Sequence, residues 1–70
     1  MKVSAGNQIK GKVVRIVEGE VHALVTLEMG CGQKISATIT MDALKDLQVE
    51  VGKEIIALVK STQVMLAVEE

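Results

Sequence analysis

The sequence contains no phenylalanine, tyrosine, tryptophan or proline, and only one cysteine and one histidine in 70 residues. Without aromatic side chains a protein cannot stack nucleic-acid bases on aromatic rings, which is a common way of holding single strands. The formal charge is −1, whereas proteins that bind the phosphate backbone gain affinity from clustered lysines and arginines. Both features argue against a nucleic-acid-binding function.

The single cysteine, Cys31, excludes an intrachain disulfide. Together with His22, the only histidine, it cannot supply the four ligands that a structural zinc site normally takes. No apolar run approaches the ~20 residues of a membrane-spanning helix, and the residues after Met1 do not form the apolar centre of a signal peptide. We therefore expect a cytoplasmic protein with no bound metal ion and no membrane association.

The short chain has room for one domain, and we expect residues 1–70 to form it. A domain of roughly 60 residues buries only about 60% of the surface that its unfolded chain exposes. Ordering each residue costs roughly 1.5 kcal/mol, which such a small core recovers with difficulty. Since neither a disulfide nor a zinc site is available, association with further copies is the remaining source of stability.

Strand patterns cover most of the chain, because Val, Ile and Thr, which favour strands, make up 21 of the 70 residues. In residues 20–29 apolar and polar side chains alternate, as in a strand with one buried face. A glycine-rich connection leads to residues 34–40, which alternate in the same way, so these two segments predict a hairpin. The other predicted strands span residues 7–17, 54–60 and 63–68. In the first of them Val14 and Ile16 break the alternation, which indicates a bulge or a kink at Gly11.

A short helix is predicted over residues 41–48. Thr40 is suited to cap its N-terminus, and Asp42 then lies in the first turn, where a negative charge is favourable. Apolar residues follow at helical spacing, namely Met41, Leu44 and Leu47. The element order predicts a mostly β fold, a five-stranded OB-like barrel with one short helix between the third and fourth strands.

The last two predicted strands, residues 54–60 and 63–68, are apolar almost without interruption. An antiparallel hairpin in a small monomer has one core to face and should leave one polar side. The second apolar face therefore needs another chain to cover it.

Catalysis has little support in the sequence. His22 lies inside a predicted strand. It is either a general base or metal ligand, or simply a residue on one face of that strand. Cys31 lies in a turn without a predictable basic neighbour. It is either a reactive thiol or simply a small residue that fits the turn. We predict no catalytic residues and expect the protein not to be an enzyme.

Two polar clusters interrupt the apolar pattern, one at residues 4–7 (Ser-Ala-Gly-Asn) and one at residues 60–62 (Lys-Ser-Thr). Both offer small hydrogen-bond donors and accessible backbone N–H groups, and the second adds an ammonium charge. Loops of this kind form concavities in which several donors converge on one oxyanion. A simple turn between strands is the alternative for such a Ser-Thr pair.

These clusters lie within longer motifs: residues 4–13 read SAGNQIKGKV, residues 39–42 read ITMD, and residues 57–65 read ALVKSTQVM. With these motifs in this order over nearly its whole length, the chain resembles the molbindins, or Mop proteins. These are small molybdate-binding proteins with a TOBE, OB-like domain, which also occurs in molybdate regulators and transport ATPases.

The resemblance implies a homohexamer, a trimer of dimers, that holds tetrahedral molybdate or tungstate at subunit interfaces and stores or buffers it in the cell. It implies no other cofactor. The motif around Ser4 of one subunit would meet Lys60 and Ser61 of another. The implied oxyanion-binding residues are Ser4, Ala5, Gly6, Asn7, Lys60, Ser61 and Thr62.

Gly6 departs from the family motif, which usually has arginine at this position. Either the missing charge-assisted donor lowers the affinity for the anion, or Gly6 offers its backbone N–H in a conformation that other residues resist. The alternative function is accordingly a structural or regulatory OB-like oligomeric module whose anion binding is weakened or lost.

Overall fold

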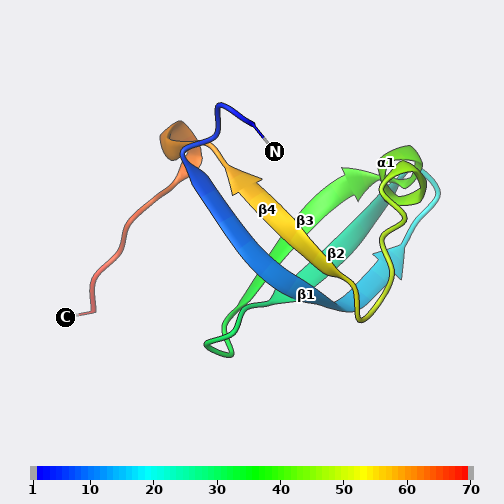
Figure 1. The fold of residues 1–70 in the computed structure, drawn as a ribbon, viewed down its shortest axis with the longest axis horizontal. Helices are drawn as coiled ribbons and strands as arrows, with labels where there is room; N and C mark the ends of the chain where they lie inside the picture. Colours follow the sequence, from blue (N-terminus) through cyan, green and yellow to red (C-terminus); the bar gives the residue numbers. More distant parts are fainter. Residues whose placement is uncertain (1, 70) are drawn as a thin grey trace.

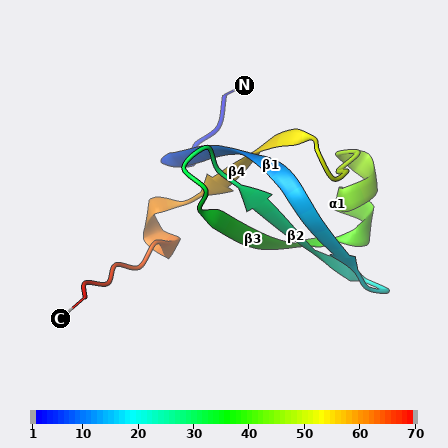
Figure 2. The same cartoon turned by 90° about the horizontal axis from the view of Figure 1, so that it is seen from below.

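The structure, a computed structural model, describes residues 2–69. Four strands form one sheet in the order β3-β2-β1-β4, and all three pairings are antiparallel. The sheet curls into an open half-barrel in which β1 and β4 arch over β2 and β3, with the helix α1 at one end (Figures 1 and 2). The elements are β1 (Asn7–Glu18), β2 (His22–Glu28), β3 (Lys34–Thr40), α1 (Met41–Asp46), β4 (Glu54–Val59) and a 3-10 helix, η1 (Ser61–Gln63).

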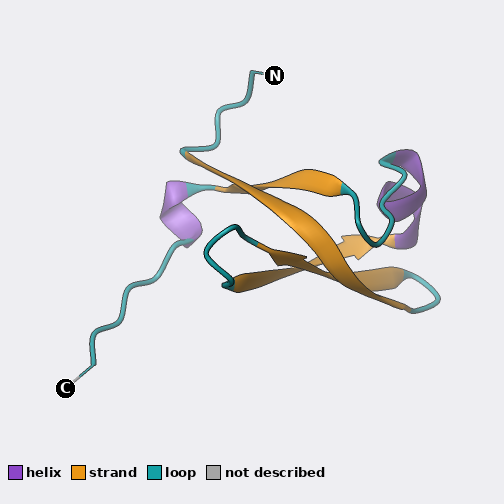
Figure 3. Ribbon diagram, turned by 60° about the horizontal axis from the view of Figure 1, so that its bottom comes forward, coloured by secondary structure: helices purple, strands orange, loops and turns teal. Residues whose placement is uncertain are grey.

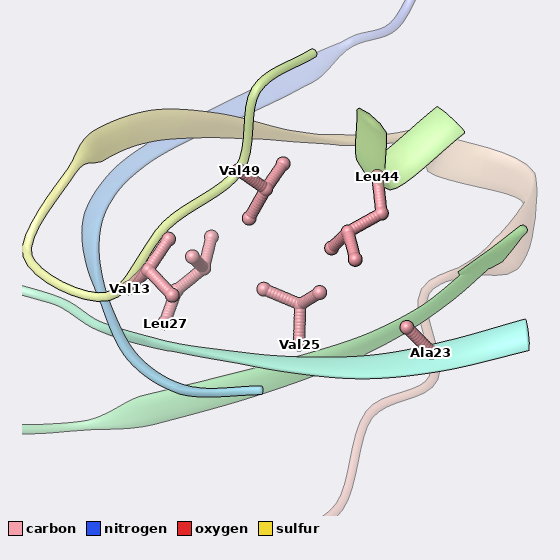
Figure 4. Packing of buried hydrophobic residues seen from close by; sticks show 6 residues of the cluster. All are labelled: Val13, Ala23, Val25, Leu27, Leu44 and Val49. Carbon is pink, nitrogen blue, oxygen red and sulfur yellow. The ribbon is translucent and has the colours of Figure 1, made fainter. Parts of the chain in front are cut away.

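The core lies in the hollow of the curled sheet, where small and medium-sized apolar side chains converge (Figure 4). Strand β2 supplies three of them, because its alternate residues all face inward. The helix and the segment after it close one end. The buried residues are Val13, Ala23, Val25, Leu27, Leu44 and Val49.

The hairpin predicted from alternation is confirmed: β3 has the predicted bounds, and β2 is shorter than the predicted 20–29. The predicted irregularity of β1 is present but lies elsewhere. The register with β2 shifts between Val13 and Arg15, which leaves Val14 as the extra residue of a bulge. A Cβ at Gly11 would lie 3.1 Å from the Leu27 Cβ, so this glycine permits the close approach of β2.

The helix begins where predicted, since Thr40 Oγ1 accepts a hydrogen bond of 3.0 Å from the backbone N–H of Ala43. It ends at Asp46 rather than at residue 48. The Lys53 ammonium group donates to the carbonyl oxygens of Leu47 and Gln48, at 2.9 and 3.0 Å, and so satisfies acceptors that the helix leaves free. Because the helix stops early, Leu47 is 61% exposed instead of joining the core.

The mostly β architecture with one short helix is confirmed, but the chain forms four strands and an open half-barrel rather than a five-stranded barrel. Strand β4 agrees with the prediction to within one residue. The fifth strand predicted over residues 63–68 does not form. Residues 61–63 form η1, and the rest of the segment leaves the sheet and pairs with neither edge strand (Figure 3). Among the described residues no helix is long and apolar enough to cross a membrane.

Candidate functional site

The two polar clusters come together at one end of the paired strands β1 and β4. Asn7 is the first residue of β1 and pairs with Val59, the last residue of β4. The Asn7 side-chain amide reinforces this junction by donating a hydrogen bond of 3.3 Å to the Val59 carbonyl oxygen. The N-terminal segment and η1 therefore lie side by side, at the end of the molecule away from α1 (Figure 1).

Gly6 of the first cluster lies beside Ser61 of the second. A Cβ added at Gly6 would lie 3.8 Å from the Ser61 Cβ, which is an ordinary van der Waals contact. Gly6 is also not among the residues with positive φ. Neither space nor backbone conformation requires glycine here, so the structure rules out a conformation closed to other residues. The effect of Gly6 is that this position of the site has no side-chain donor.

The structure thus brings the two clusters together within one chain. The contact between clusters of different subunits, which the resemblance implies, stays a prediction. Of the seven predicted site residues, only Ala5 is partly buried and the others are exposed. Within residues 2–69, Asn7 is the only one of the seven whose side chain forms a hydrogen bond. The hydroxyl groups of Ser4, Ser61 and Thr62 and the ammonium group of Lys60 can therefore all turn toward a ligand.

The chemical character of this surface is that of an anion site. Lys60 is the only charged side chain in either cluster, and it stands directly before η1. Hydroxyl and backbone N–H groups next to an ammonium group can surround an oxyanion with donors. The described residues contain no group of three or more His, Cys, Asp or Glu side chains that could hold a metal ion.

On a single chain the site is an open surface rather than a pocket. Cavities lie beside α1, beside the turn after β2 and between β3 and β4, and none of these three is lined by a residue of either cluster. An exposed set of donors leaves an anion in contact with water, which weakens each electrostatic contact. A tight site needs a further surface to cover it.

His22 and Cys31 do not belong to this site or to a common one. His22 is the first residue of β2 and pairs with Thr40, whereas Cys31 lies exposed in the turn beyond the other end of β2. The length of the strand separates them. The structure thus shows no contact between these two side chains.

Comparison with known proteins identifies the chain's relatives. Residues 3–66 match the model of the TOBE domain family. The chain is 51% identical over 69 residues to a probable molybdenum-pterin-binding protein of Haemophilus influenzae, and the match covers 99% of this chain and 100% of that protein.

Solved structures show the same fold. MopII from Clostridium pasteurianum, in an apo form, superimposes with a TM-score of 0.90 at 46% identity, covering 96% of this chain and 100% of that one. The cytoplasmic molybdate-binding protein ModG, with molybdate bound, gives a TM-score of 0.81 at 37% identity, over 94% of this chain and 53% of that one.

Proposed function

We propose that this chain, which belongs to the TOBE domain family and within it to the small molybdenum-pterin-binding (Mop) proteins, binds molybdate or tungstate and stores it in the cytoplasm without catalysing a reaction. The observation that carries the proposal is the meeting of two donor clusters, from opposite ends of the chain, at the junction of β1 and β4. The proposed binding residues are Ser4, Ala5, Gly6, Asn7, Lys60, Ser61 and Thr62.

The donor set suits an oxyanion that carries no proton. Molybdate at neutral pH presents only acceptors, whereas hydrogen phosphate carries a proton that would face another donor in this site. An unpaired buried polar group costs ~1–3 kcal/mol, so phosphate should bind more weakly. Sulfate is also free of protons, so only the size of the site can reject it. Tungstate is nearly the same size as molybdate and should bind about equally well.

The proposed site lies between subunits of a homohexamer arranged as a trimer of dimers. Two features of the single chain support an assembly. The donor clusters are uncovered, and both faces of β4 are apolar, with Ile56 and Leu58 on its outer face 40% and 47% exposed. A second copy placed against this end would remove water from the anion and cover apolar surface at the same time.

The second candidate function is a structural or regulatory oligomeric module with weakened anion binding. The observation that favours it is Gly6, which leaves Lys60 as the only charged donor in the clusters. Charge-assisted hydrogen bonds are roughly twice as strong as neutral ones, so one guanidinium group fewer is a substantial loss.

Calorimetric titration of the purified protein separates the two functions. We expect molybdate and tungstate to bind with similar affinity, with sulfate and phosphate at least ~10-fold weaker, the equivalent of about 1.4 kcal/mol. Heat signals absent for all four anions, in a protein that remains oligomeric, would instead support the structural module.

A further inference from the structure

The side chain of Asn7 is already bonded within the chain. Its amide nitrogen, Nδ2, donates a hydrogen bond of 3.3 Å to the carbonyl oxygen of Val59. The same two residues form the last pair of the β1–β4 ladder, so the backbone pairing and the side-chain bond meet at one point. This point lies where β1 begins and β4 ends (Figure 1). Asn7 is therefore placed to act on the residue that follows Val59.

The residue after Val59 is Lys60, the only charged residue of the two donor clusters. The Val59 carbonyl group and the Lys60 nitrogen belong to one peptide unit, which is planar and trans. A hydrogen bond that fixes the direction of this carbonyl group therefore also fixes where the Lys60 Cα lies and in which direction its side chain leaves the backbone. The Asn7 bond thus acts at the point where the chain passes from β4 to η1.

The constraint matters because Asn7 and Lys60 are both exposed, so packing does not hold either side chain in place. A lysine side chain loses conformational freedom when its ammonium group binds an anion. Ordering the start of that side chain in advance lowers this cost, and such preorganisation raises affinity without adding a contact to the ligand. The neighbouring Gly6 has no side chain that could do the same.

We propose that Asn7 is a positioning residue of the anion site, which acts on molybdate through Lys60 rather than by binding the anion itself. The chemistry of the amide agrees with this role. One of its N–H groups is given to Val59, and its oxygen, Oδ1, is an acceptor that an oxyanion without protons cannot bond. The inference rests on the proposed function and assigns one of its seven residues an indirect role.

A double-mutant cycle of Asn7 and Lys60 tests the proposal in the full-length protein. Asn7→Ala should weaken molybdate binding roughly 3- to 10-fold while Lys60 is present, which is the effect of losing one ordinary hydrogen bond. In the Lys60→Ala background the same change should cost less than ~2-fold, because no ammonium group is left to position. Equilibrium dialysis, with molybdenum measured in both compartments, covers the weak affinities of the cycle.

Two further variants control the cycle. Asn7→Leu also lacks the donor but keeps nearly the same shape, so it replaces Asn7→Ala if that variant folds poorly. Gln8→Ala removes the same kind of amide group from the next residue, which is exposed and lies on the opposite face of β1. Gln8→Ala should leave the affinity unchanged, and a loss as large as that of Asn7→Ala would overturn the proposal.

Equal losses from Asn7→Ala in both backgrounds would also overturn it, because a direct ligand and a residue that merely supports the fold both give additive effects. The absence of any loss would do the same. The proposed function fails differently, since the unmodified protein would then bind no molybdate and the inference would fall with it. Additive losses in a protein that binds molybdate would refute only the role of Asn7.

Discussion

Replacing Leu66 with aspartate is expected to dissociate the oligomer. Leu66 is 94% exposed in the single chain and is not part of its core, so the substitution should act on contacts between copies rather than on the fold of one chain. Burying a leucine side chain contributes ~2 kcal/mol, and an unpaired carboxylate in an apolar interface costs several kcal/mol more. Association of the copies should therefore weaken at least ~100-fold, since 1.4 kcal/mol is a factor of about ten. Light scattering at micromolar concentration measures the change in mass.

Val51→Asp is the matched control, because Val51 is 64% exposed and lies in the turn before β4, outside residues 64–68. This variant should keep the mass of the unmodified protein. A Leu66→Asp protein that also keeps that mass would show that residues 64–68 do not hold the subunits together. Circular dichroism on the same samples reports whether the dissociated chains retain their sheet.

Removing the Lys60 ammonium group is expected to cause the largest loss of anion affinity. Lys60 is the only charged side chain in the two donor clusters. Hydrogen bonds to charged groups contribute ~1.5–3 kcal/mol, so Lys60→Ala should weaken molybdate binding by roughly 10- to 150-fold. Calorimetry measures the affinity. Light scattering should show an unchanged oligomer, because Lys60 is exposed and does not line the cavity between β3 and β4.

Gly6→Arg is the complementary variant. Position 6 has room for a Cβ and a backbone conformation that other residues adopt. The variant should therefore fold normally. The added guanidinium group should tighten molybdate binding by a factor similar to the one that Lys60→Ala loses. Unchanged affinity in both variants would place the bound anion elsewhere on the protein.

Local patterns predicted the centre of the fold well. The hairpin of β2 and β3 follows from apolar alternation, which reflects one buried face and needs no knowledge of distant residues. The start of α1 follows from the cap that Thr40 provides. The end of α1 was missed because Lys53, which binds the carbonyl groups of Leu47 and Gln48 just after the helix, comes from the following segment.

Features that depend on distant partners could not be predicted in the same way. The bulge of β1 lies at Val14 because the register with β2 shifts there, and alternation within β1 alone suggested Gly11. Residues 63–68 have the composition of a strand, but a strand forms only beside an available edge. In the single chain this segment projects away from the sheet and pairs with neither edge strand.

The candidate site shows the same limit. Hydrogen-bonding chemistry identified both clusters, and the resemblance to the Mop proteins joined them into one site. Their physical meeting arises from the pairing of β1 with β4, which joins Asn7 to Val59 across 52 residues of sequence. No spacing rule within the sequence could have given the contact of Gly6 with Ser61.

The most direct test of molybdate binding between the two clusters is an anomalous difference map from crystals grown with molybdate, recorded at the molybdenum absorption edge. We expect the strongest peaks beside η1, with molybdate oxygens ~2.7–3.2 Å from Lys60 Nζ and Ser61 Oγ. Donors from the segment around Ser4 should complete the shell, with a second copy covering it. Peaks only at other surfaces, or no peak in crystals of the oligomer, would contradict the proposed site.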